Sequence, residues 1–359
     1  WTNMGIYLIN QPSYQYDAVT HTLTFSGVDL MSRMTGLRNG YLIGVTYKVP
    51  AGNNIREVII AILAENGFKK YVVSECYNNN GDIQDVPYDM EYEMGSCWYD
   101  ILSDLRDILP NYQIYFDVDG VFHYEPIPYT DSEPIMIDDN IWDENVISET
   151  VNVDFESVKN SIEVYGRTHD IENFPSEVVI DGGNIKLTIG TVVQLVEHLI
   201  IGFKLEQNVT GNITLQVNEL GAKPLIGYDG KQMTSLAKDE YWVARYTKDE
   251  KWEFLGHQQA YGRYKDENPK SPFYIGNPAG EIKLVLYGGE YEYIFSDDLA
   301  EQRAKFEIYQ RCRMNDTISI TCVPIYWADV NWMVTYTPFD KKEPKQYTIK
   351  SITVNLDPN

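Results

Sequence analysis

The sequence predicts a mainly β fold of the α+β class, and three observations support this. The 359 residues include 28 Tyr, 12 Phe and 7 Trp, and aromatic side chains favour half-buried pleated surfaces. Many segments alternate apolar and polar residues, whereas only a few show helical spacing. Hydrophobic residues make up 43% of the chain, which is enough for a packed core, and the length corresponds to roughly two or three domains.

Strands are expected wherever apolar side chains recur at every second residue, because this spacing is typical of a strand with one buried face. We therefore expect the apolar side chains of each such segment to face a core. The segments are 21–26, 113–117, 162–165, 212–218, 281–287 and 317–323. A last strand is expected over 347–354, which alternates imperfectly but is rich in β-branched residues.

Helices are expected where apolar residues recur every three or four positions. A short helix is predicted over 28–35. A longer one is predicted over 54–66, with Asn53 or Asn54 as the N-cap and Gly67 as the C-terminal stop.

Two further helices have an N-cap serine. Ser96 precedes an amphipathic segment that runs through Leu109 and is closed by a proline. Ser296 precedes the segment 297–314, which begins with acidic residues and ends near Arg311 and Arg313. This order of charges suits the helix dipole.

The segment 115–124 contains Asp119-Gly120 between two aromatic-rich strands, and this dipeptide favours a tight hairpin turn. Asp117 and Asp119 could instead begin a calcium loop. Such a loop needs more oxygen ligands in the following residues, and Val121 to His123 do not supply them. The hairpin is the preferred interpretation.

The net charge of the chain argues against nucleic acid as a partner, and its hydropathy argues against membrane insertion. Its 29 basic and 53 acidic residues give a formal net charge of -24, so we expect no stable nucleic-acid binding, which needs clustered Lys and Arg. The longest apolar run, 58–64, is far too short to span a bilayer. We therefore expect no membrane insertion.

The cysteines Cys76, Cys97, Cys312 and Cys322 form no CxxC pair, which argues against a zinc knuckle or a redox dithiol. A chain of this size does not need disulfides, so we expect reduced thiols in a protein made in the cytoplasm.

One segment carries a possible nucleophile. Gly95-Ser96-Cys97-Trp98 resembles the nucleophile signature of papain-like cysteine peptidases, in which a helix N-terminus favours the thiolate. The candidate partners His198 and His257 fall outside the spacing of that signature. The preferred interpretation is a capped amphipathic helix that contains Cys97 in its first turn.

Other catalytic signatures are missing from the sequence. The histidines form no HExxH pattern, and no GxSxG, P-loop or GxGxxG motif occurs. We therefore predict no catalytic, cofactor-binding or metal-ligating residues, no cofactor and no enzymatic activity. Sugar binding is an open alternative, because aromatic side chains could stack on sugar rings, although a β-core uses the same residues. The candidates are Tyr228, Tyr241, Trp242, Tyr246 and Trp252.

Glycine, proline and charged residues concentrate at 129–134, 173–176 and 264–278, which we interpret as boundaries. The segment 171–275 is accordingly predicted to be an inserted β-rich module.

Several segments together resemble the central baseplate hub protein of contractile phage tails and phage-tail-like bacteriocins. They cover most of the chain outside 171–275, and the order of the motifs carries the resemblance. The segments are 21–40 (HTLTFSGVDLMSRMTGLRNG), 101–107 (ILSDLRD), 115–122 (YFDVDGVF), 158–166 (VKNSIEVYG), 300–309 (AEQRAKFEIY) and 329–332 (DVNW).

The resemblance implies a division of the chain into domains. The first hub β-barrel would combine 1–50 with 131–170, and a small α/β domain would be inserted at 51–130. The β-rich module would follow at 171–275, and a second hub β-barrel would occupy 276–359.

The resemblance also implies a function. The chain would be a homotrimer whose two barrels per subunit form a pseudo-sixfold ring, which joins the tail tube to the central spike. Other baseplate proteins and the tape measure would be neighbours in a virion or bacteriocin particle assembled in the bacterial cytoplasm. From the net charge we expect acidic side chains to line the central opening; the alternative is that they spread over the outer surface for solubility. Alternatives are a tail-tip protein of a non-contractile phage, a cell-wall-degrading tail protein that uses Cys97, or a sugar-binding module at 171–275.

Overall fold

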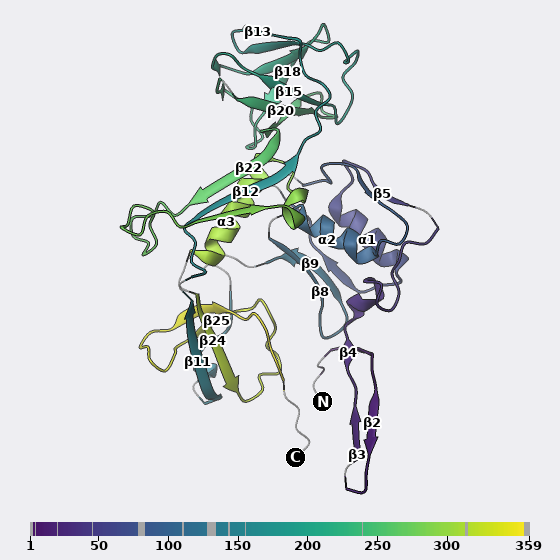
Figure 1. Cartoon of the computed structure of the whole chain (residues 1–359), viewed down its shortest axis with the longest axis vertical. Helices are drawn as coiled ribbons and strands as arrows, with labels where there is room; N and C mark the ends of the chain where they lie inside the picture. The colour runs from purple at the N-terminus through teal and green to yellow at the C-terminus, as the bar shows by residue number, and fades with distance from the viewer. Residues whose placement is uncertain are drawn as a thin grey trace.

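The structure is a computed structural model with three α-helices among its described residues, and the fold is mainly β, as the sequence predicts. The molecule is elongated, with a seven-stranded sheet at one end and a narrow hairpin arm at the other (Figure 1). No helix in the described part of the chain is both long and apolar enough to cross a bilayer. The described residues are 3, 5–19, 21–44, 46–77, 83–109, 111–127, 134–142, 144–154, 156–238, 240–312 and 315–354.

The two helices α1 (Ile55–Glu65) and α2 (Trp98–Asp107) lie in one mixed α/β unit with two small sheets. Asn54 caps α1 as predicted, because its side chain accepts a hydrogen bond from the Glu57 N–H at 3.0 Å. The sheets are β5 (Tyr47–Val49) with β7 (Met90–Tyr92), and β6 (Tyr71–Val73), β9 (Phe122–Pro126) and β8 (Tyr112–Phe116) in that order.

Helix α2 begins one residue later than predicted, with Cys97 rather than Ser96 at the N-cap position. The Asp100 carboxylate accepts a hydrogen bond from the Cys97 N–H at 2.8 Å, so the acidic residue of the first turn holds this end of the helix. The predicted helix over 28–35 is a short 3-10 helix, η1 (Leu30–Arg33).

The hairpin predicted at Asp119-Gly120 is confirmed. The Asp117 carboxylate accepts the N–H groups of Asp119 at 2.9 Å and Val121 at 2.8 Å, and Gly120 has a φ of 69°. The Asp117 carboxylate is therefore used by the turn itself, as the hairpin interpretation expects.

The central layer is a three-stranded sheet covered by α3 (Asp297–Arg311) on one face. Its strands are β22 (Gln259–Lys265), β12 (Ser161–Thr168) and β23 (Lys283–Tyr287), in that order. Gly262 permits this packing, since a Cβ there would lie 2.1 Å from the Glu301 backbone nitrogen. Ser296 caps α3 as predicted, and the short helix η3 (Gly289–Tyr293) precedes it.

The seven-stranded sheet surrounds a core of its own, which includes Trp252 and Phe203. The backbone of 173–176 lies between its two ends, because Asn173 accepts from the Gly202 N–H and Ser176 donates to Thr188. The order is β13 (Glu177–Asp181), β14 (Asn184–Thr188), β17 (Thr214–Val217), β18 (Ala222–Ile226), β21 (Trp252–Gly256), β20 (Tyr241–Tyr246) and β15 (Ile200–Lys204), with a small pair, β16 (Val209–Thr210) and β19 (Ser235–Leu236).

A further unit joins residues before and after the central layer. The strand predicted over 347–354 runs instead from Lys345 to Thr348, and beyond it only Ile349 still bonds to the opposite backbone, at Asn331 and Trp332, among the described residues. The strands are β10 (Ile135–Ile137) and β26 (Lys345–Thr348) on either side of β25 (Met333–Tyr336), and the ribbon β11 (Val146–Asp154) with β24 (Asn315–Cys322); the short helix η2 (Asp139–Ile141) lies between β10 and β11.

These pairings connect 135–154 with 315–348. The boundaries inferred from the resemblance stay a prediction.

The N-terminal hairpin projects from the body of the molecule as an arm (Figure 1). We call residues 8–28 the arm. The prediction that the apolar face of 21–26 is buried is wrong for the single chain: Leu23 is 63% exposed and Phe25 61% exposed. The reason is that the arm extends away from the cores of the other units. Its strands are β1 (Leu8–Ile9) with β4 (Gly27–Val28) and β2 (Ser13–Tyr16) with β3 (His21–Thr24).

Candidate functional site

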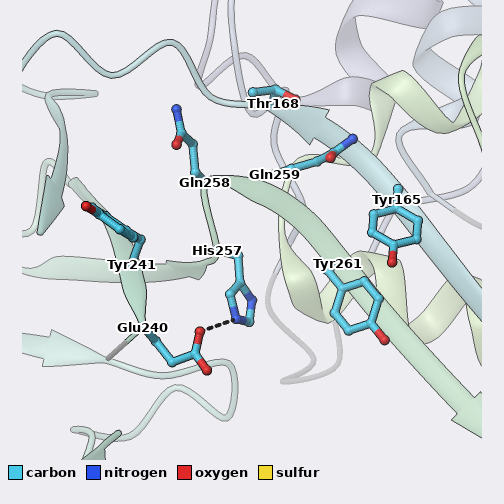
Figure 2. Close-up of a pocket in the computed structure, with 8 residues that line it drawn as sticks. All are labelled: Tyr165, Thr168, Glu240, Tyr241, His257, Gln258, Gln259 and Tyr261. Carbon is cyan, nitrogen blue, oxygen red and sulfur yellow. Dashed lines mark ion pairs between the residues drawn. The ribbon is translucent and has the colours of Figure 1, made fainter. Parts of the chain in front are cut away.

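A groove of about 650 Å³ lies where the seven-stranded sheet meets the central layer (Figure 2). One wall comes from β12 and β22, the other from the start of β20, and the link between β21 and β22 passes along it. The lining residues are Tyr165, Thr168, Glu240, Tyr241, His257, Gln258, Gln259 and Tyr261.

The pairing of β12 with β22 places two tyrosines side by side in this wall. Tyr165 lies opposite Tyr261 in the antiparallel register, and their ring centroids are 5.1 Å apart at 49°. Ile162 and Val164 belong to the core between the sheet and α3. Because side chains alternate along a strand, Tyr165 has the opposite orientation to Val164 and is available to the groove.

His257 is held by the first residue of α3. The carboxylate of Asp297 lies 2.6 Å from His257 Nδ1 and accepts the His257 N–H at 3.1 Å, and its other oxygen accepts the Tyr261 N–H at 2.8 Å. Burial raises the pKa of Asp297, although these hydrogen bonds oppose the rise.

Gly256 makes room for this carboxylate. A Cβ at Gly256 would lie 2.0 Å from Asp297 Oδ2, and its φ of 99° is one that L side chains rarely adopt.

The remaining contacts of His257 orient its ring toward the groove. The Trp242 ring lies 5.1 Å from the His257 ring, and the Glu240 carboxylate lies 3.7 Å from His257 Nε2 (Figure 2). The imidazole therefore lies between two carboxylates, with Asp297 at Nδ1 and Glu240 at Nε2.

The chemistry of the lining is polar and aromatic. Its described residues include hydroxyl, amide, imidazole and carboxylate groups but no Lys or Arg. Glu240 is the one acidic side chain among them, whereas glycoside hydrolysis uses a pair of carboxyl groups. The arrangement can therefore stack on and hydrogen-bond to a ligand.

The candidate nucleophile Cys97 lies outside this groove. Its N–H is bound to Asp100, and both burial and the Asp100 charge raise the pKa of its thiol. No hydrogen bond or ion pair among the described residues joins Cys97 to a histidine; His198 is paired with Glu197 at 3.8 Å, and His257 lies in the groove.

None of the four cysteines forms a disulfide, and the Cys312 thiol donates a hydrogen bond to Asp266 at 3.3 Å. Cys76 is buried against Tyr124, and burial raises the pKa of its thiol to about 12. Within the described part of the chain, no group of His, Cys, Asp or Glu side chains is arranged to hold a metal ion.

The structure separates the aromatic residues proposed for sugar stacking. Trp252 and Tyr246 are buried in the core of the seven-stranded sheet, so they cannot stack on a ligand. Tyr241 is 52% exposed and lines the groove. The sequence analysis did not identify Tyr165 or Tyr261. The alternation in 162–165 indicates that Tyr165 faces away from the core, but no local pattern indicates that Tyr261 is its neighbour on a distant strand.

Comparisons with known proteins give one partial family match. The family described as "Domain of unknown function (DUF5048)" matches residues 270–358, which is less than half of the chain. No curated protein matches the sequence.

Two solved structures are similar over most of the chain. The tail protein from Neisseria meningitidis MC58 is 11% identical, with a TM-score of 0.48, over 95% of this chain and 72% of that chain. The 43 kDa tail protein of prophage MuSo2 from Shewanella oneidensis is 9% identical, with a TM-score of 0.48, over 96% of this chain and 75% of that chain.

Proposed function

We propose that the chain is a structural subunit of a phage-type tail and, within it, the non-enzymatic baseplate hub. In this role three copies close into a ring that joins the tail tube to the central spike. The class of particle comes from the sequence segments that resemble the hub family, and it agrees with the names of the two similar structures.

The arm is the observation that carries the assembly role. The alternation of 21–26 is the pattern of a strand with one buried face, yet every residue of β2 and β3 is exposed in the single chain. The apolar side chains of this strand have the spacing of a buried face but are exposed in the single chain. Such an exposed apolar surface indicates that another chain covers it.

The arm has one apolar and one polar face. Tyr14 pairs with Leu23 and Tyr16 with His21, so these side chains share a face, and Phe25 follows Leu23 by two residues. Ser13, Gln15, Thr22 and Thr24 occupy the other face. Covering Tyr14, Tyr16, Leu23 and Phe25 would contribute roughly 1 to 2 kcal/mol each before the costs of association.

A second uncovered surface lies at the same end of the molecule (Figure 1). The ribbon β11–β24 pairs with no third strand among the described residues, so both outer edges are open. Ile147 on this ribbon is 70% exposed and Val151 38% exposed. Long open edges favour pairing with another chain, and closure into a ring covers them.

The proposed partners are further copies of the chain, the tail tube, the central spike, other baseplate proteins and the tape measure. The net charge of -24 suits a channel that must pass nucleic acid without binding it. An exposed arm and an acidic chain are equally compatible with a contractile tail, a bacteriocin or the tip of a non-contractile tail. An image of the particle with this subunit labelled would distinguish these three.

Self-association tests the proposal directly. Sedimentation velocity of the purified chain should give a trimer, and the double variant Leu23→Ser, Phe25→Ser should weaken self-association by at least tenfold. The matched control is Thr22→Ala with Thr24→Ala, which changes the polar face of the same strand and should leave assembly intact. A chain that stays monomeric alone and with the other tail proteins would contradict the hub role.

The enzymatic alternative has its own test. If the chain digests cell wall, Cys97→Ser should abolish that digestion, whereas a structural hub has none to lose. A large loss of real activity in this variant would replace the structural proposal with the peptidase.

A further inference from the structure

We propose that the groove between the seven-stranded sheet and the central layer binds a segment of a neutral oligosaccharide. This is a ligand-binding activity in addition to the structural role, and it does not depend on that role.

Both walls of the groove carry aromatic side chains. Tyr165 and Tyr261 stand side by side on the central layer, whereas Tyr241 lines the groove from β20 with its hydroxyl directed away from them (Figure 2). Each tyrosine combines an apolar ring with a polar hydroxyl. A pyranose ring has the complementary character, with C–H groups on its faces and hydroxyl groups around its rim.

The polar side chains suit the rim of such a ring. Gln258 and Gln259 offer both donors and acceptors, and Thr168 offers a hydroxyl. Gln259 uses its amide nitrogen to donate to the Gly166 carbonyl at 3.2 Å, which orients its oxygen as an acceptor.

The charge and composition of the lining argue against other ligand classes. A phosphate or polyanion needs Lys or Arg, and the described lining residues contain neither, although the Lys204 ammonium lies 5.5 Å from the Tyr241 ring centroid; Glu240 would repel an anion. A lipid needs an aliphatic lining, which this groove also lacks. A neutral polyhydroxylated ligand fits both constraints, and about 650 Å³ lies within the usual range for small-molecule sites.

The groove is organised before a ligand arrives. Asp297 fixes His257 through two hydrogen bonds, and Trp242 packs against its ring. The two tyrosines of the central layer sit on paired strands rather than on loops. Little ordering is therefore needed on binding, which favours affinity.

Isothermal titration of the full chain with chitohexaose, cellohexaose and maltohexaose tests the inference, with polyglycerol phosphate as an anionic probe. At least one neutral hexasaccharide should bind at millimolar concentration or below, and the anionic polymer should not. Tyr241→Ala should weaken binding roughly three- to tenfold through loss of one ring.

The matched control is Tyr326→Ala, because Tyr326 is 54% exposed and Tyr241 52% exposed, and Tyr326 lies outside the groove. Both variants should unfold as the parent chain does, so a loss confined to Tyr241→Ala reports on the groove. The inference is overturned if none of the three neutral probes binds at about 10 mM, if only the anionic polymer binds, or if both variants bind equally. None of these outcomes changes the result of the self-association test.

Discussion

The arm and the seven-stranded sheet are built from the same kind of sequence, alternating and rich in aromatic residues, yet they treat their apolar side chains in opposite ways. In the sheet, Trp252 is fully buried and Phe203 is 1% exposed. In the arm, Leu23 and Phe25 are more than half exposed. The alternating apolar side chains are therefore buried within the seven-stranded sheet and exposed in the arm. An alternating sequence therefore indicates that a face will be buried, and not whether its own chain buries it.

The comparison assigns different roles to the two regions. A core of its own lets the seven-stranded sheet contribute to the stability of the single chain. A two-stranded ribbon is marginal by itself, and we propose that the apolar face of the arm serves association instead. Three predictions test this difference, from the largest expected effect to the smallest.

Replacing Trp252 by Ala should lower the free energy of unfolding by about 3 to 5 kcal/mol, because it removes a fully buried side chain and leaves a cavity. Urea denaturation measures this. Tyr241→Ala, on the neighbouring strand β20, should change the value by less than about 0.5 kcal/mol. Equal effects of the two variants would break the contrast between inward and outward faces.

His169, in the segment that connects β12 to the seven-stranded sheet, should make the free energy of unfolding depend on pH. His169 is 3% exposed, and burial together with the Arg167 and Arg245 charges lowers its pKa to about 4. An unfolded histidine has a pKa of about 6.5, so the unfolded chain binds the proton first as the pH falls. Stability is therefore fully present above about 6.5, and about 3 kcal/mol is lost between there and about pH 4.

The variant His169→Phe should lack this contribution, which is measured as the difference between its urea-unfolding free energies at pH 7 and pH 4.5 and those of the parent chain. The other titrating groups are common to both proteins and cancel in the difference. Identical pH profiles would show that this junction is open to water, as the arm is.

The smallest effect is expected in the arm. Leu23→Ser with Phe25→Ser should change the unfolding free energy of a dissociated subunit by less than about 0.5 kcal/mol, because both side chains already face solvent. Urea denaturation at concentrations below association provides the measurement. A loss of 2 kcal/mol or more would mean that the arm is part of the subunit's own core.

Local chemistry allowed several elements to be predicted. Asn54 and Ser296 cap their helices because a side-chain oxygen binds a backbone N–H within three residues, and this needs no tertiary information. The Asp119-Gly120 turn is equally local. The start of α2 was misplaced by one residue, since Asp100 rather than the Ser96 hydroxyl holds that end.

Contacts between distant segments could not be predicted in the same way. β11 pairs with β24 and β12 with β23 across more than a hundred residues, and no short pattern encodes such partners. The groove depends on this kind of contact. Tyr165, Tyr241 and Tyr261 line one groove only after two units have packed together. Trp252 is also an aromatic residue in an alternating segment, yet it lies in a core, so the sequence alone does not distinguish the two cases.

Thr168 and Gln259 are direct neighbours in the pairing of β12 with β22, although 169–258 separate them along the chain. The chain therefore leaves the central layer and returns to it at a single point, about one strand spacing apart. Because its two ends are adjacent, the whole segment 169–258 can be replaced by another module without altering the order of the parent strands, at the cost of the contacts that His257 and Arg245 make with Asp297 and Pro87.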